Sequence, residues 1–324
     1  MEENTEQRVD LTLFSEKIQE LKDRIASVIV GQEQTVDLVL TAILANGHVL
    51  IEGVPGVAKT LLARLTARLI DADFSRVQFT PDLMPSDVLG TTVFNMKTNG
   101  FDFHQGPIFA DIVLVDEINR APAKTQAALF EVMEERQISI DGTTHRMGDL
   151  YTILATQNPV EQEGTYKLPE AQLDRFLMKI TMDYPSLEEE VSILERHHTN
   201  AALVKLEDVH PVITRDELLA FRKLMDKVFV DRTLLQYIAL IVQQTRTSKA
   251  VYLGASPRAS VAMLQSSKAY ALLQGRDFVT PEDIKFVAPY VLQHRLILTA
   301  EAEMEGYSPV KVTQRLIDKV EVPK

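Results

Sequence analysis

The chain has 324 residues, which suggests about two domains at a typical ~150 residues per domain. Its formal net charge of −12 argues against a general nucleic-acid binder, because such a protein needs a basic surface. The chain has no cysteine, so disulfides, zinc–thiolate sites and cysteine nucleophiles are excluded. The N-terminal MEENTEQRVD is polar and acidic, and no apolar run approaches the ~18 residues of a membrane span. We therefore expect a cytoplasmic protein without a membrane-spanning segment.

The first half of the chain alternates between helical and strand patterns. Apolar residues recur at helical spacing in Gln32–Asn46 and again in Leu61–Ile70. Short apolar runs between these helices are typical of strands buried on both faces. The expected strands are His48–Ile51, Arg76–Thr80, Ile112–Asp116, Tyr151–Thr156 and Phe176–Met182. This alternation predicts an α/β fold with a mostly parallel sheet.

Two insertions interrupt the alternation. Phe94–Phe103 contains Asn99-Gly100 at its centre, and Ile138–Met147 contains Asp141-Gly142. Both dipeptides are strong signals for a tight turn between antiparallel strands, so each insertion is expected to form a β-hairpin.

After about Pro185 the pattern indicates helices only. Helix starts are marked by capping-box spacing or by a hydroxyl residue directly before proline. These starts are Ser186 with Glu189, Thr214 with Glu217, Ser256-Pro257 and Thr280-Pro281. We therefore expect three parts: an N-terminal helical segment at 1–30, an α/β core at 31–185 and a smaller all-helical domain at 186–324.

A glycine-rich segment, Gly53–Thr60 (GVPGVAKT), follows an expected strand and opens an expected helix. This is the context of a phosphate-binding P-loop, in which backbone N–H groups and the helix dipole favour anions. Lys59 would neutralise the β- and γ-phosphates, and the hydroxyl of Thr60 would ligate Mg²⁺. Ala58 stands where the commoner pattern has glycine, and it fits there if its φ is negative.

Polar side chains follow two of the expected strands. Asp116-Glu117 ends the IVLV strand, where an aspartate holds Mg²⁺ through water and the next glutamate can deprotonate the attacking water. The glutamate favours ATP hydrolysis over a small GTPase, which typically uses glutamine. Asn158 follows the YTILAT strand, and its amide would hold the lytic water in the same crevice. The alternative role of Asn158 is to form a turn before Pro159.

Three arginines are candidates for stabilising charge in the transition state. We expect Arg175, in the segment Leu173–Phe176, to act as a finger donated to a neighbouring subunit, with Arg120 as the alternative. Arg258 lies in the first turn of an expected helix, where a positive charge is unfavourable unless an anion faces it. We expect that anion to be the γ-phosphate bound by the same chain.

Taken together, these motifs resemble the AAA+ ATPases, and more closely the MoxR family. The resemblance rests on GVPGVAKT, LVDEINRAPAKTQAALFEVMEE, ATQNPVEQEGTYKLPEAQLDRF and GASPRA, in this order over roughly residues 12 to 320. It implies a P-loop AAA+ core of three αβα layers with a helical lid, working as a ring that is often hexameric. The two hairpins resemble the helix-two insert and the pre-sensor hairpin of this branch.

The resemblance also implies ligands and partners. The segment around Val30 and Gly31 resembles the part of such proteins that packs against adenine. The residues expected to bind ATP are Val30, Gly31, Gly53, Val54, Pro55, Gly56, Val57, Ala58, Lys59, Thr60, Leu61 and Asp116, with Thr60 and Asp116 also on Mg²⁺. MoxR proteins are linked to maturation of partner proteins, including metal-cofactor insertion, often beside partners with von Willebrand A domains.

Three functions compete at this point. The first is an ATPase that remodels or matures a client protein. The second is a nucleic-acid motor, but the hairpins offer only Lys97, His145 and Arg146 to an acidic chain, which makes nucleic acid an unlikely partner. The third is a non-catalytic, nucleotide-gated scaffold, against which the intact P-loop lysine and acidic pair argue.

Overall fold

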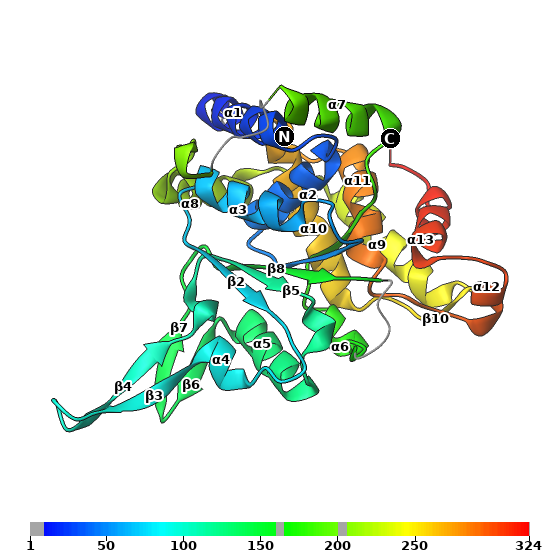
Figure 1. The fold of residues 1–324 in the computed structure, drawn as a ribbon. Helices are drawn as coiled ribbons and strands as arrows, with labels where there is room; N and C mark the ends of the chain where they lie inside the picture. Colours follow the sequence, from blue (N-terminus) through cyan, green and yellow to red (C-terminus); the bar gives the residue numbers. More distant parts are fainter. Residues whose placement is uncertain (1–9, 160–164, 200–205, 324) are drawn as a thin grey trace, which may run out of the picture.

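A five-stranded parallel sheet lies at the centre of the protein (Figure 1). The computed structural model describes residues 10–159, 165–199 and 206–323. The order of the strands is β2-β5-β8-β1-β9, and all neighbouring strands are parallel. Their bounds are β1 Val49–Gly53, β2 Phe74–Gln78, β5 Ile112–Asp116, β8 Thr152–Gln157 and β9 Met178–Met182. The expected α/β class is therefore confirmed, with each strand within two residues of its expected end.

Both faces of the sheet are covered by helices, and β5 shows how. Ile112 and Leu114 join one apolar cluster with α2 and α3, whereas Val113 and Val115 join a second cluster with α4 and α5. Successive side chains of a strand point to opposite faces, so an uninterrupted apolar run suits a strand buried on both. The helices of this half are α2 Glu33–Leu44, α3 Lys59–Leu69, α4 Pro85–Leu89, α5 Ala123–Glu135 and α6 Glu170–Leu173, with short 3₁₀ helices η1 Pro107–Phe109 and η2 Ile118–Arg120.

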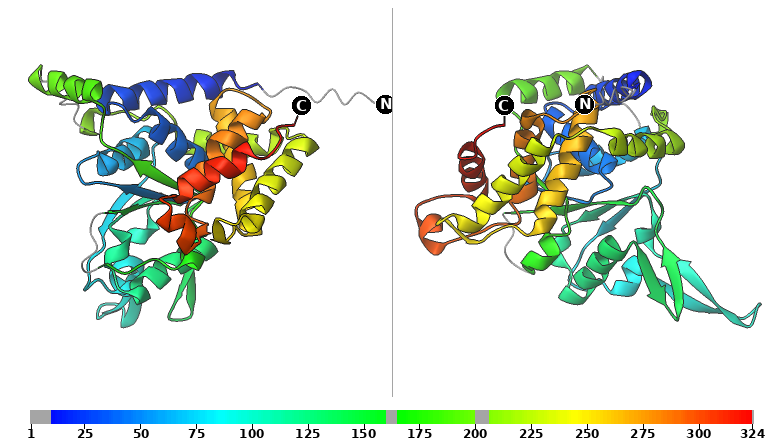
Figure 2. Two further views of the ribbon diagram at one scale, coloured as in Figure 1. Left: turned by 90° about the vertical axis from the view of Figure 1, so that its right-hand side faces the viewer. Right: turned by 180° about the vertical axis from the view of Figure 1, so that it is seen from behind.

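The two insertions form the expected hairpins and project together from the sheet (Figure 2). Their strands are β3 Gly90–Asn95 with β4 Gly100–Gln105, and β6 Gln137–Ile140 with β7 Thr143–Arg146. In the second hairpin Asp141 and Gly142 both have positive φ, 50° and 79°, as a two-residue type I′ turn requires. The hairpins touch where the rings of Phe103 and His145 lie 4.2 Å apart.

Three further helices pack outside α2 and α3. They are α1 Thr12–Val28, α7 Leu187–His198 and α8 Arg215–Leu224, and short 3₁₀ helices η3 Leu206–Asp208 and η4 Met225–Lys227 flank α8. Helix α1 buries one apolar face, and its Phe14 meets Phe221 of α8 edge to face. Ser186 and Thr214 form the expected capping boxes of α7 and α8. Residues 1–9 of the expected N-terminal segment lie outside the described ranges.

The C-terminal region is mostly helical, as expected, with one difference. Its helices are α9 Arg232–Thr247, α10 Pro257–Leu273, α11 Pro281–Leu292, α12 Ala300–Met304 and α13 Pro309–Asp318. Two short strands, β10 Val251–Leu253 and β11 Ile297–Leu298, pair with each other in antiparallel orientation. The expectation of helices only is therefore wrong here, because these strands are too short to show a strand pattern in the sequence. Within the described ranges, no helix has the length and apolar character needed to cross a bilayer.

A buried arginine joins this region to the sheet. The guanidinium of Arg295, only 3% exposed, donates to the Asp174 carboxylate at 2.7 Å and to the Phe176 carbonyl at 2.7 Å. It also donates to the carbonyls of Leu177 and Val291. Burial lowers the pKa of Arg295, and Asp174 acts in the opposite direction. Such an ion pair is sensitive to the loss of one partner, because the other charge is left uncompensated.

We expect Arg295→Met to lower the free energy of unfolding by about 3 kcal/mol, because it leaves Asp174 unpaired and several carbonyls without a donor. Urea denaturation followed by circular dichroism measures this loss. The matched control is Arg64→Met on the exposed face of α3, which should change stability by less than about 0.5 kcal/mol. Equal losses in the two variants would contradict the proposed weight of this contact.

Candidate functional site

The glycine-rich segment connects the carboxyl end of β1 to the first turn of α3, as expected. Helix α3 begins at Lys59, so the first N–H groups of the helix face the loop. Gly53 is packed so closely that a Cβ would come within 2.7 Å of the Met182 carbonyl. Gly56 has a φ of +87°, a conformation that glycine adopts without strain. The geometry is that of a backbone cradle for an anion.

Ala58 corrects one expectation from the sequence. Its φ is +63°, so the condition that this angle be negative is not met. A non-glycine residue in this left-handed conformation carries strain of about 1–2 kcal/mol. The loop therefore holds the shape that glycine would give it, and the surrounding β1–α3 connection compensates for the cost.

The ammonium group of Lys59 lies inside the loop. It donates to the Gly53 carbonyl at 2.5 Å and is half-buried. Burial lowers the pKa of Lys59, while the nearby carboxylates of Asp116 and Glu117 act to raise it. The structure thus brings the lysine and the acidic pair together at one edge of the sheet, although they come from different strand ends.

Asp116 is buried and held on both of its oxygens. One oxygen accepts from the Thr156 hydroxyl at 3.1 Å, and the other accepts from the Arg76 guanidinium at 2.6 Å. The Thr156 hydroxyl in turn accepts from the Glu117 N–H at 3.0 Å. Thr156 therefore ties the carboxyl ends of β5 and β8 together. No sequence motif marks Thr156, although it is a polar residue near the end of an apolar strand.

Glu117 adopts a left-handed conformation, with φ of +56°, and its carboxylate is shared between two partners. Gln78, at the end of β2, donates to it at 2.9 Å, and the Arg120 guanidinium lies 3.0 Å from the same oxygen. Gln78 was also missed, because a glutamine at a strand end carries no motif. Arg120, the alternative finger, lies beside the glutamate of its own chain.

The side of the loop that faces α7 forms a cavity of about 270 Å³. Its walls come from the segment after α1 with Val30, from the P-loop with Val57, and from α7 with Ile193 and His197. Gly31, with φ of +70°, packs against the Glu189 side chain, where a Cβ would overlap it. Val30 therefore lines the same cavity as Val57 of the P-loop.

Asn158 directly follows β8 and is buried, with 9% of its surface exposed. It therefore lies at the same edge of the sheet as the P-loop and Asp116, since neighbouring parallel strands end together. Residues 160–164, in the segment that follows it, lie outside the described ranges.

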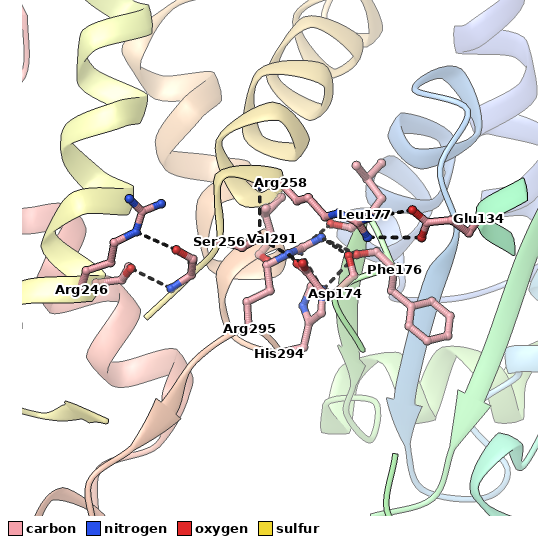
Figure 3. Close-up of polar contacts among 12 residues, drawn as sticks. Glu134, Asp174, Phe176, Leu177, Arg246, Ser256, Arg258, Val291, His294 and Arg295 are labelled. Carbon is pink, nitrogen blue, oxygen red and sulfur yellow. Dashed lines mark hydrogen bonds and ion pairs between the residues drawn. The ribbon is translucent and has the colours of Figure 1, made fainter. Parts of the chain in front are cut away.

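Arg175 and Arg258 line one groove at the opposite edge of the sheet, where Arg258 contacts Glu134 (Figure 3). Arg258, at the start of α10, makes two hydrogen bonds to the carboxylate of Glu134 near the end of α5, at 2.7 and 3.2 Å. The Arg175 guanidinium approaches the same carboxylate at 3.2 Å. These pairs are partly exposed, and exposed ion pairs contribute only about 0.2–1 kcal/mol each.

The expectation that Arg258 faces the γ-phosphate of its own chain is not met by this arrangement. The groove that contains Arg175 and Arg258 is lined by residues 45–48, which precede β1, whereas the P-loop follows β1. At ~3.3 Å per residue, the five residues of β1 separate these two edges by roughly 16 Å. The reason is that α10 docks its first turn beside Asp174, the C-cap of α6 in the segment before β9, and not over the P-loop.

Comparisons with known proteins agree with this geometry. A family described as "ATPase family associated with various cellular activities (AAA)" matches residues 48–178, and the AAA lid domain matches residues 243–318. The chain is 47% identical to the uncharacterized protein YeaC of Bacillus subtilis, with 93% of each chain covered. It is 44% identical to the chaperone MoxR1 of Mycobacterium tuberculosis, covering 93% of this chain and 81% of the relative. A crystal structure of a candidate ATPase from Cytophaga hutchinsonii is 40% identical, with a TM-score of 0.89 and 97% of each chain covered.

Substitution by glycine tests whether the positive φ of Ala58 carries strain. We expect Ala58→Gly to raise the free energy of unfolding by up to about 1 kcal/mol, because the relief of strain exceeds the extra chain entropy of glycine. The control is Ala63→Gly in the buried interior of α3, which should lower stability by about 1 kcal/mol. Chemical denaturation compares the two, and a loss of stability in both variants would refute the argument from φ.

Proposed function

The chain belongs to the MoxR family of AAA+ ATPases, and we propose that it binds and hydrolyses ATP and uses the cycle to remodel a client protein. The observation that supports this most directly is the cluster at the carboxyl edge of the sheet. There Lys59, Asp116, Glu117 and Thr156 come together, and Asn158 follows the neighbouring strand β8. These are a phosphate counter-charge, a metal-binding carboxylate and a general base in one crevice.

The oxygen donors suit Mg²⁺. This ion prefers hard oxygen ligands and commonly takes one or two from the protein and the rest from phosphates and water. Thr60 and Asp116 would supply the protein donors, and no cage of three or more acidic or histidine side chains occurs in the described part of the chain. When bound, Mg²⁺ neutralises charge on the phosphates. Arg76 would then release the Asp116 oxygen that it holds.

Other residues of the chain would activate the water, hold it in place and contact adenine. Glu117 would accept the proton of the attacking water, and Asn158 would hold that water in place. Gln78 and Arg120 both bind the Glu117 carboxylate, so they set its direction before the reaction. Val30 and Gly31 would contact adenine. We place the protein in the cytoplasm as part of this proposal.

We further propose a ring in which Arg175 and Arg258 complete the site of the next subunit. The groove around them, about 530 Å³, is lined by four arginines and two carboxylates, so its excess positive charge suits a phosphate. A head-to-tail contact that brings this edge to a neighbour's P-loop must close into a ring or polymerise. In this proposal, 31–185 is the nucleotide-binding core, 186–324 is the lid and 1–30 is an added helical segment.

We propose that the hairpin β3–β4 contacts the client protein. The hairpin β3–β4 exposes Phe94, Met96 and Phe101, and the basic candidate His145 stacks against Phe103 instead of standing free. Exposed apolar side chains suit contact with a protein better than contact with a phosphate backbone. The family resemblance adds maturation of a partner, including metal-cofactor insertion, with a von Willebrand A domain protein beside it.

Two substitutions test ATP binding and ATP hydrolysis separately. Lys59→Ala should weaken ATP binding by about 10- to 100-fold, because it removes a charged hydrogen-bond donor to phosphate. Glu117→Gln should bind ATP as the wild type does. It should hydrolyse ATP at least about 100-fold more slowly, because an amide is not a base. Equilibrium binding of a fluorescent ATP analogue and phosphate release measure both. Lys124→Ala, at an exposed position of α5, is the control. Wild-type turnover by Glu117→Gln would refute its assignment as the base.

The ring can be tested by mixing variants. Arg175→Ala should bind ATP normally but lose about 10³-fold in rate, the typical worth of an arginine finger. A mixture of Arg175→Ala with Lys59→Ala should recover activity, because some interfaces pair an intact P-loop with an intact finger. Specific activity of the wild type should rise with protein concentration. A fully active monomer, or a dead mixture in which mixed rings are detected by mass, would contradict the trans arrangement and make Arg120 the next residue to test.

A further inference from the structure

The carboxylate of Glu134 contacts both Arg175 and Arg258 at the edge where the strands of the sheet begin. Its Oε1 accepts from Arg258 at 2.7 Å, and its Oε2 lies 3.2 Å both from Arg258 and from the Nε of Arg175. The three side chains come from α5, from the segment between α6 and β9, and from the first turn of α10. One carboxylate thus holds together groups from the core and the lid.

The second carboxylate of the groove is already engaged. Asp174 accepts from Arg295 at 2.7 Å and from the Ser256 hydroxyl at 3.0 Å. Two guanidinium groups repel each other, so Arg175 and Arg258 need a shared counter-ion to stay side by side. Among the residues that line the groove, Glu134 is the carboxylate that serves them.

The two carboxylates differ in how firmly they are held. In the Asp174–Arg295 pair the arginine side chain is 3% exposed, whereas Arg258 in the Glu134 pair is 57% exposed. Solvent screens an exposed pair strongly and a buried pair weakly. The Asp174 contact therefore keeps the lid in place, while the Glu134 contact yields to a more highly charged anion such as a nucleotide phosphate.

We propose that Glu134 is a positioning residue that aligns Arg175 and Arg258 as a pair for the phosphates bound by the next subunit. This inference rests on the proposed function. It adds a role for a residue that contacts neither the nucleotide of its own subunit nor that of the next subunit. Before the contact forms, Glu134 sets the direction of both guanidinium groups. When the neighbour's phosphate arrives, it replaces the carboxylate, so no new alignment is needed.

The first experiment measures the kinetics of Glu134→Gln, which keeps the shape of the side chain but removes its charge. We expect kcat to fall by about 10- to 100-fold, since small misplacement of catalytic groups has costs of this size, while ATP binding to its own P-loop is unchanged. Glu131→Gln, one turn earlier on the exposed face of α5, is the matched control and should behave as the wild type. A wild-type kcat for Glu134→Gln overturns the inference.

Glu134→Asp gives an independent reading if the glutamine variant folds poorly. It keeps the charge but shortens the reach by one methylene, so its kcat should lie between those of the wild type and Glu134→Gln. A rate for Glu134→Asp no higher than that of Glu134→Gln contradicts the inference, because the charge at this position would then not matter.

Mixing distinguishes positioning from a general structural effect. If Glu134 acts through the arginines on a neighbour's site, Glu134→Gln mixed with Lys59→Ala should recover activity, and Glu134→Gln mixed with Arg175→Ala should not. If Arg175→Ala recovers with Lys59→Ala but Glu134→Gln does not, Glu134 acts on its own site and the inference fails alone. If neither mixture recovers although mixed rings form, the proposed ring mechanism fails.

Discussion

The carboxylate of Asp174 determines how the two halves of the protein fit together. It accepts from the buried Arg295 of the lid and from Ser256, the N-cap of α10, and it is the residue directly before Arg175. The position of Arg258, two residues after Ser256, therefore depends on the same contact as the position of Arg175. Because the Arg295 guanidinium also donates to carbonyls on both sides of the junction, the lid has little freedom to rotate without leaving buried polar groups unpaired.

A parallel sheet imposes a second constraint. All of its strands end at one edge, so the P-loop, Asp116 and Asn158 gather there without any long-range design. The strands also begin at one edge, and this is where Arg175 and Arg258 lie. One chain thus carries the P-loop at one edge of its sheet and the two arginines at the other edge. In the proposed ring, each edge supplies what the other edge of the next subunit needs.

Local patterns predicted the parts of the structure that local forces decide. The apolar run of β5, the turn at Asp141-Gly142 and the capping boxes all follow from neighbouring residues, and the sequence was enough for each. The placement of Arg258 was not predictable in this way. Its partner Glu134 lies 124 residues earlier, and the choice between the P-loop and the far edge depends on where α10 docks as a body. The φ of Ala58 likewise depends on the strand and helix that the loop must join, and the roles of Thr156 and Gln78 depend on strand order.

Helix α5 connects the two edges directly. It begins at Ala123, shortly after η2, in which Arg120 contacts Glu117, and it ends at Glu135, next to Glu134. Its 13 residues span roughly 20 Å at ~1.5 Å per residue. A helix moves as a rigid rod over this distance, so a shift of η2 when Glu117 changes partners would move Glu134 as well. Because the Asp174–Arg295 contact is buried and the Glu134 contacts are partly exposed, such a shift would be absorbed at Glu134. On the proposed function, the state of a subunit's own nucleotide would thus alter the alignment of the arginines that it offers to its neighbour, without a rearrangement of the lid.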